Sequence, residues 1–368
     1  MNKKSKWSIN LGRIAGIEVR IHWTFFILFL YVLIVGRSQG QNLSDSLMML
    51  AFILAVFFCV TLHEFGHALM AKKFGCKTRD ITLLPIGGLA RMNRLPENPS
   101  QEMLVALAGP FVNLVIAVIL YVWLSLNDGL TELIDFAKLD AENFFPALFV
   151  ANVVLAVFNL IPAFPMDGGR VLRALLSMRL PRHKATRIAG GVGQFIAILF
   201  VFIGLFYNPF LVFIGVFIFL GAQIETDYYQ SKYLLRTFRI GDAMIHQFKP
   251  LHPSEPLSAA VNALLDGHAS EFVVQDNSEP AGILTRKIIL EALKTHGLDV
   301  PISQVMEKNF SVAEEEGLLD KAYEKMRMNN ISIMPVVKGK KLVGLIDMEN
   351  IMEFLLVRAA IANNKKLS

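Results

Sequence analysis

Residues 46–71 read SLMMLAFILAVFFCVTLHEFGHALMA, an uninterrupted apolar run apart from the polar group His63, Glu64 and His67. The run is long enough to cross a bilayer, which takes about 20 residues of helix. Positions i and i+4 share one face of a helix, so both imidazoles can reach a single metal ion. Charged groups at mid-bilayer cost about 2.5–3.5 kcal/mol on insertion scales, which favours a functional reason for them.

Glu64 directly follows the first histidine, where it can take a proton from a water molecule that the metal activates. Catalytic zinc keeps three protein ligands and one open position. The best third ligand is Asp167, the only acid in the fourth apolar segment, where Pro162 and Pro165 interrupt the helix. The alternative for Asp167 is a helix-capping turn. Cys59, four residues before His63, could be a further ligand, but a small apolar filler is the simpler role.

Six apolar segments predict an α-helical polytopic membrane domain with six transmembrane helices, at about 21–36, 46–71, 103–126, 144–164, 188–206 and 209–224. Alternate connecting loops are basic, which predicts a multi-pass protein of the cell membrane with both termini in the cytosol. The basic residues are Lys3, Lys4, Lys6, Lys72, Lys73, Lys77, Arg79, Arg91, Arg94, Arg170, Arg173, Arg179, Arg182, Lys184 and Arg187. The loop after the third segment is acidic, with Asp128, Glu132, Asp135, Asp140 and Glu142.

Composition agrees with a membrane protein, because 54% of the 368 residues are hydrophobic and only 18% are charged. The net charge of +5 could indicate nucleic acid. The lysines and arginines lie in loops between apolar runs, so we expect them to orient the chain against membrane lipid, with no nucleic-acid partner. Two cysteines imply no disulfide framework.

The remaining chain resembles an ordinary soluble domain with an internal repeat. Asp242-Ala-Met is echoed by Gln304-Val-Met, and Gly282-Ile-Leu is echoed at the same offset by Gly344-Leu-Ile. Each unit pairs an amphipathic helix with a short β-rich segment and a second helix. Two units are too few for a solenoid, so a paired α/β module is expected. The predicted domains are a membrane domain at 1–228, a linker at 229–241, and units at 242–300 and 301–368, the second including the C-terminal tail.

These motifs together resemble the site-2 protease family of intramembrane zinc metalloproteases, in the prokaryotic branch that carries a CBS-domain pair. The resemblance rests on HEFGH at 63–67, Gly87-Gly88, Ala108-Gly109-Pro110 with Asn113, and the N-x-x-P-x-x-P-x-D-G-G string at 159–169. It implies one zinc ion per chain held by His63, His67 and Asp167, with Glu64 activating water. It also implies that Asn159 helps to hold the substrate, a transmembrane or membrane-associated protein.

Other membrane residues allow two interpretations each. The stretch 83–92, with Gly87 and Gly88, is too short to span, and it is expected either to form a β-like edge for an extended substrate or to be a plain cytosolic loop. Asn113 is expected either to hydrogen-bond between helices or to line the substrate site. Rival functions are a CBS-gated transporter, which the absence of an inverted repeat disfavours, and an inactive binding protein.

CBS pairs resemble adenosine-nucleotide sensors whose motif ends in G-h-h-T/S-x-x-D, where h is hydrophobic. Here the two units read Gly282-Ile-Leu-Thr285-Arg-Lys-Ile288 and Gly344-Leu-Ile-Asp347-Met-Glu-Asn350, and neither has the final aspartate. Thr285 and Asn350 could make partial contacts with an adenosine nucleotide. The alternative is a role in homo-oligomerisation or in docking the substrate.

Overall fold

The computed structural model describes residues 8–364 except 39, 41, 86, 93–95, 128–141 and 268–269. The chain divides into two compact units, Met1–Asp227 and Tyr228–Ser368, each with its own core. The lysines at positions 3, 4 and 6, Arg94 and the acidic loop as far as 141 lie outside the described residues.

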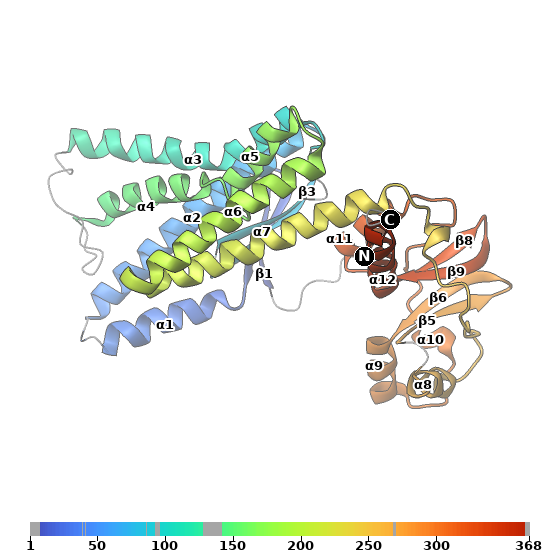
Figure 1. Ribbon diagram of the computed structural model, residues 1–368. Coiled ribbons are helices and arrows are strands. Elements are labelled where there is room, and N and C mark those ends of the chain that lie inside the picture. Colours follow the sequence, from blue (N-terminus) through green and yellow to red (C-terminus); the bar gives the residue numbers. More distant parts are fainter. Residues whose placement is uncertain are drawn as a thin grey trace. The chain divides into compact units, whose positions relative to one another are not determined.

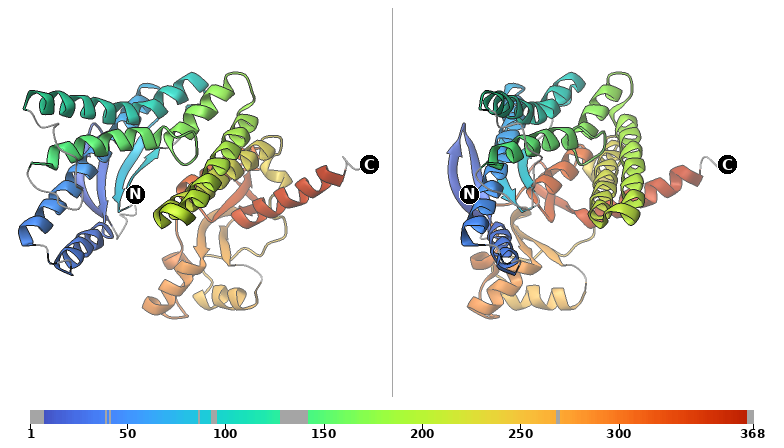
Figure 2. Two further views of the ribbon diagram at one scale, coloured as in Figure 1. Left: turned by 60° about the vertical axis from the view of Figure 1, so that its left-hand side comes forward. Right: turned by 90° about the vertical axis from the view of Figure 1, so that its left-hand side faces the viewer.

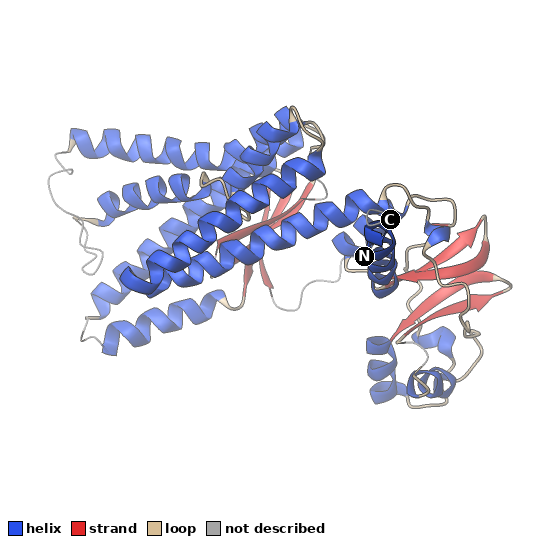
Figure 3. Ribbon diagram, viewed as in Figure 1, coloured by secondary structure: helices blue, strands red, loops and turns tan. Residues whose placement is uncertain are grey.

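The first unit is dominated by apolar helices (Figures 1 and 3). Their bounds are α1 (Phe25–Ser38), α2 (Leu43–Lys73), α3 (Pro99–Leu126), α4 (Phe144–Asn159), α5 (Asp167–Ser177), α6 (Arg182–Tyr207) and α7 (Pro209–Leu235). Among the described residues, α2, α3, α6 and α7 are long and apolar enough to cross a membrane, whereas α1 and α4 are shorter apolar helices of 14 and 16 residues. A helical membrane-type domain is therefore confirmed, and the number of six spans stays a prediction.

A four-stranded sheet accompanies these helices, and the sequence predicted only part of it. Its strands are β1 (Ser8–Ile14), β2 (Ile17–His22), β3 (Thr78–Leu84) and β4 (Gly87–Met92), in that spatial order. The pairs β1–β2 and β3–β4 are antiparallel hairpins, and β2 and β3 are parallel. The first helix therefore begins at Phe25 instead of residue 21, because residues 17–22 form β2, which pairs with β1 and, over residues 18–21, with β3.

The sheet packs against α2 through β3 and β4, and its strands lie among the helices of the first unit in Figure 2. Alternate strand residues point to one face and make a small buried cluster with Phe65 and Ala68 of α2: Ile17, Val19, Ile81 and Leu83. Period-two alternation of this kind is what a half-buried strand requires. The β-like interpretation of residues 83–92 is thus confirmed as part of a longer hairpin.

The fourth apolar helix ends earlier than the sequence predicts, at Asn159 instead of residue 164. Pro162 disfavours helical backbone just before it, so the chain turns and α5 begins directly at Asp167. A Cβ on Gly168 would lie 2.3 Å from the Ile161 carbonyl oxygen, and one on Gly169 would lie 2.6 Å from Ala163 carbon. The two glycines therefore let α5 pack directly on the turn that precedes it.

A buried ion-pair network joins α5 to α3 and α7, and joins α6 to α3. Arg173 of α5 donates to Glu102 of α3 and, at 2.7 Å, to Glu225 of α7. Arg182 of α6 donates to the second oxygen of Glu102 at 2.7 Å. Arg173 was counted above as a loop charge, but it is fully buried. It therefore acts in packing, because a buried charge must be paired.

The second unit consists of two α/β repeats, which confirms the predicted paired α/β module. Its elements are a 3-10 turn η1 (Ile240–Asp242), α8 (Leu257–Leu265), β5 (Glu271–Asp276), β6 (Glu279–Thr285), α9 (Arg286–His296), α10 (Ile302–Val305), β7 (Ala313–Glu314), α11 (Leu319–Asn329), β8 (Ile333–Lys338), β9 (Lys341–Asp347) and α12 (Met348–Asn364). The antiparallel pairs β5–β6 and β8–β9 are the repeated cores, with β7 parallel to β8.

The segment predicted as a linker, 229–241, is helical as far as Leu235 because α7 continues into the second unit. Leu235 is fully buried in a core with Ile240 and Leu319. Tyr228 stacks on Tyr323 at a centroid distance of 6.1 Å. One helix thus carries a residue of the buried ion network and residues of the second unit's core.

Candidate metal centre

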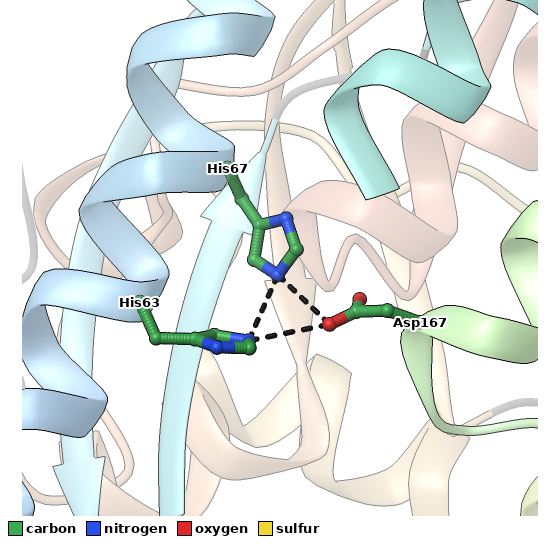
Figure 4. Close-up of side chains that lie close together, drawn as sticks. All are labelled: His63, His67 and Asp167. Carbon is green, nitrogen blue, oxygen red and sulfur yellow. Dashed lines mark hydrogen bonds and ion pairs between the residues drawn. The ribbon is translucent and has the colours of Figure 1, made fainter. Parts of the chain in front are cut away.

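Three buried side chains from two helices converge on one point (Figure 4). His63 and His67 project from one face of α2, and Asp167 is the first residue of α5. The Asp167 Oδ2 atom lies 3.2 Å from His63 Nε2 and 3.0 Å from His67 Nε2, and the two Nε2 atoms are 3.0 Å apart. It is the only group of three or more potential metal-ligating side chains within the described ranges.

The outer nitrogens of both rings are held by oxygen atoms. His67 Nδ1 lies 2.7 Å from the Val105 carbonyl oxygen, and His63 Nδ1 lies 2.5 Å from Asn113 Oδ1. A carbonyl oxygen only accepts, so each Nδ1 carries the proton and donates it. Each Nε2 of the neutral ring then presents a lone pair toward the Asp167 carboxylate.

Three electron-pair donors at such distances repel one another unless a cation, either a proton on one ring or a metal ion, lies among them. The separations of 3.0–3.2 Å are slightly below the roughly 3.3 Å edge of a tetrahedron built with about 2.0 Å bonds to zinc. Two imidazoles and one carboxylate are also the donor set of many catalytic zinc sites. The residues present therefore fit a zinc ion.

Gly109 of α3 leaves room for that ion. A Cβ at this position would lie 2.2 Å from His67 Nε2 and 2.6 Å from His63 Nε2. Both lengths are far below a van der Waals contact. Glycine at position 109 thus keeps clear the space that both lone pairs face.

Glu64 lies next in the chain to His63, and the strand β4 covers it. A Cβ on Gly88 would lie 2.7 Å from Glu64 Cγ, so β4 crosses directly over this side chain. Gly87, the first residue of β4, has a positive φ of 136°, a conformation that favours glycine. Gly88 therefore lies beside the candidate catalytic acid, and Gly87 precedes it at the start of β4.

The remaining candidate residues lie farther from the metal centre or make other contacts. Asn159 ends α4 and donates to the Leu155 carbonyl of its own helix at 2.9 Å. Asn113 is fully buried behind His63, which favours the interhelical interpretation over substrate contact. Cys59 is outside the metal group and accepts a hydrogen bond from Asn152 at 3.4 Å. Thr285 and Asn350 lie in the second unit, at the starts of α9 and α12.

Sequence reasoning missed Gly109, the Val105 carbonyl and Asn152. A backbone carbonyl leaves no signal in residue type. Gly109 was noted only as part of a motif. The available signal was residue type. A glycine and two asparagines stand inside apolar helices, where small and amide residues indicate close contacts between helices.

Apolar helices around a His–His–Asp centre are the features of a membrane metalloprotease. The Peptidase family M50 model matches residues 51–204, and the CBS domain model matches 240–295 and 302–357. The chain is 31% identical over 347 residues to Zinc metalloprotease MJ0392 of Methanocaldococcus jannaschii, covering 94% of this chain and 95% of the relative. It is 27% identical to Stage IV sporulation protein FB of Bacillus subtilis over 220 residues, covering 59% and 68%.

The site-2 protease structure from Methanocaldococcus jannaschii shares 38% identity, with 60% of this chain and 95% of that chain covered and a TM-score of 0.44. The protein belongs to peptidase family M50 and is a metalloprotease with a C-terminal CBS pair. The resemblance drawn from the sequence motifs is confirmed.

Proposed function

We propose that this metalloprotease is an intramembrane zinc endopeptidase that cuts a membrane-embedded or membrane-associated protein. In this proposal His63, His67 and Asp167 hold one zinc ion, and Glu64 is the catalytic acid and base. The observation that carries it is the approach of three electron-pair donors to within 3.0–3.2 Å among apolar helices. We further propose a multi-pass topology with both termini cytosolic, as the charges of the loops predict.

When bound, zinc makes a water molecule acidic enough to serve as a nucleophile near neutral pH and polarises the peptide carbonyl. Glu64 takes a proton from that water as its oxygen bonds to the carbonyl carbon. As the carbon–nitrogen bond breaks, Glu64 gives the proton to the leaving nitrogen. The Nδ1 hydrogen bonds of both rings keep their Nε2 atoms aimed inward throughout.

The substrate is proposed to bind as an extended strand along β4. This strand ends the sheet and pairs with β3 on one side, so a peptide could add to its other edge. Gly88 puts this strand next to Glu64, and small residues there leave room for a second backbone. Asn159, at the end of α4, is proposed to contact the substrate from the other direction.

The proposal predicts metal-dependent cleavage inside a membrane span. Purified protein in liposomes, mixed with a reporter that contains one transmembrane helix, should cut within that helix, as mass spectrometry of the products would reveal. The chelator 1,10-phenanthroline should stop cleavage, and added zinc should restore it. Cleavage confined to segments outside the membrane, or insensitive to the chelator, would reject the proposal, and ion flux without cleavage would favour the transporter.

We also propose that the CBS pair modulates the protease and binds an adenosine ligand at Asn350. In the first CBS repeat Ile288 stands where the motif has an aspartate, and it packs against the hydrophobic core. Thr285 caps α9 by accepting from Ile288 N at 3.3 Å. In the second CBS repeat Asn350 Oδ1 is buried and has no hydrogen-bond partner among the described residues. A ribose hydroxyl could satisfy this acceptor.

The charges near Asn350 disfavour phosphate. Asp347 accepts from the Asn350 backbone N–H at 2.7 Å. Burial raises the pKa of Glu271 above its usual value, and the neighbouring Asp347 carboxylate raises it further, against a hydrogen bond from Ser332. We therefore expect the full chain to bind adenosine more tightly than AMP, and AMP more tightly than ATP, in calorimetric titrations. Tighter binding of ATP than of adenosine would contradict this expectation.

A further inference from the structure

Asn152 of α4 does not touch the metal centre, yet it is connected to it through one other side chain. Its Nδ2 atom donates to the Leu148 carbonyl oxygen at 2.9 Å, and its Oδ1 atom accepts from Asn113 Nδ2 at 2.9 Å. Asn113 of α3 in turn places its Oδ1 atom 2.5 Å from His63 Nδ1. Both asparagines have 0% exposure. We call Asn113 and Asn152 the asparagine pair.

The hydrogen bonds of the asparagine pair can be arranged in only one direction. The Leu148 carbonyl cannot donate, so the amide nitrogen of Asn152 must face it and the amide oxygen must face Asn113. Asn113 must then turn its nitrogen toward Asn152 and its oxygen toward His63. That oxygen accepts only a proton from Nδ1, which leaves Nε2 with its lone pair. A backbone carbonyl on α4 thus decides which nitrogen of a ring on α2 can bind metal.

We propose that Asn152 is a positioning residue that sets the zinc affinity of the site by fixing, through Asn113, the tautomer and ring orientation of His63. The inference rests on the proposed zinc site. Groups that hold the outer nitrogen of a metal-binding histidine typically change metal affinity about 10–100-fold when they are removed. The ring of His67 has a separate anchor, the Val105 carbonyl, so the effect should fall on one ligand of three.

Simple packing is the competing explanation for two buried asparagines. It predicts that their replacement lowers thermal stability without a specific effect on metal affinity. The positioning role predicts a loss of zinc affinity that a residue with the same acceptor can rescue. Asn152→Leu removes the acceptor that orients Asn113. Asn152→Asp keeps an oxygen toward Asn113, so it should preserve the orientation.

The test is the zinc dissociation constant of the purified full chain in detergent, measured by competition with a chelator. We expect about tenfold weaker binding for Asn152→Leu and a value within about threefold of the wild type for Asn152→Asp. Thr186→Val is the matched control, because this buried hydroxyl on α6 donates to Arg182 O of its own helix and makes no other hydrogen bond within the described part of the chain. Its zinc affinity should be unchanged even where its melting temperature falls.

Equal zinc affinity in Asn152→Leu and the wild type would overturn this inference, whereas a wild type that binds no zinc would overturn the proposed function instead. A second measurement does not depend on any variant folding. In 15N spectra of metal-free wild-type protein with labelled histidines, His63 should be the tautomer protonated at Nδ1. A neutral His63 ring protonated at Nε2 would equally reject the positioning role.

Discussion

Gly109→Ala is expected to remove zinc from the protein and with it all proteolysis. The new methyl carbon would lie 2.2 Å from His67 Nε2 and 2.6 Å from His63 Nε2, in the space that both lone pairs face. Neither ring can retreat easily, because the Val105 carbonyl and Asn113 hold their outer nitrogens. Metal analysis of the purified variant should find less than about a tenth of a zinc ion per chain, against about one in the wild type.

The matched control is Gly191→Ala on α6. A Cβ at this position would meet nothing within 4 Å, and the helical glycine has ordinary backbone angles. Replacing such a glycine usually stabilises a protein by about 0.4–1 kcal/mol, so zinc and activity should both be retained. A Gly109→Ala protein that is folded and carries a full complement of zinc would refute the proposed position of the ion.

Glu64→Gln is expected to keep its zinc and lose its activity. Glutamine has the same shape, and Glu64 is outside the metal group, so the ligands stay in place. The amide cannot take a proton from water or return it to the leaving nitrogen. General acid–base groups typically contribute a factor of about 10²–10⁴ to the reaction rate. The cleavage rate of Glu64→Gln should therefore fall by about 10⁴-fold.

A second variant separates loss of the base from loss of any negative charge. Glu291 on α9 is 70% exposed and belongs to the second unit, so Glu291→Gln should cleave the reporter at the wild-type rate. Time courses with equal amounts of zinc-loaded protein would compare the three forms. Normal turnover by Glu64→Gln would exclude its role as the base.

The metal group was predictable because each of its members stands out locally. His63 and His67 have the spacing of one helical turn, and Asp167 is an acid at a proline break in an apolar segment. None of this requires knowledge of the packing between helices.

The sheet was not predictable from local pattern. Its central pairing joins Glu18 to Asp80 in parallel register, and residues 17–22 are apolar enough to be taken for the start of the first helix. Strand pairing depends on partners far away in the sequence, so a short apolar run cannot be assigned from its own periodicity. The ends of helices were likewise not predictable from local pattern. The helix α4 ends before Pro162, because a proline disfavours helical backbone at the residue that precedes it.

The asparagine pair depended on information that the sequence lacks. An asparagine in an apolar helix indicates an interhelical hydrogen bond but not its partner. Only the contacts of Asn152 with Leu148 and Asn113 give the direction of the chain of hydrogen bonds. In the same way, Arg173 could be taken for a loop charge until its two carboxylate partners were known.

The most direct measurement is the zinc content of purified wild-type and Asp167→Ala protein, determined by mass spectrometry after dialysis. If ligands from α2 and from the start of α5 share one ion, the wild type carries about one zinc per chain and the variant loses nearly all of it. Zinc retained at the wild-type level without the Asp167 carboxylate would contradict the three-ligand centre on which the catalytic account depends.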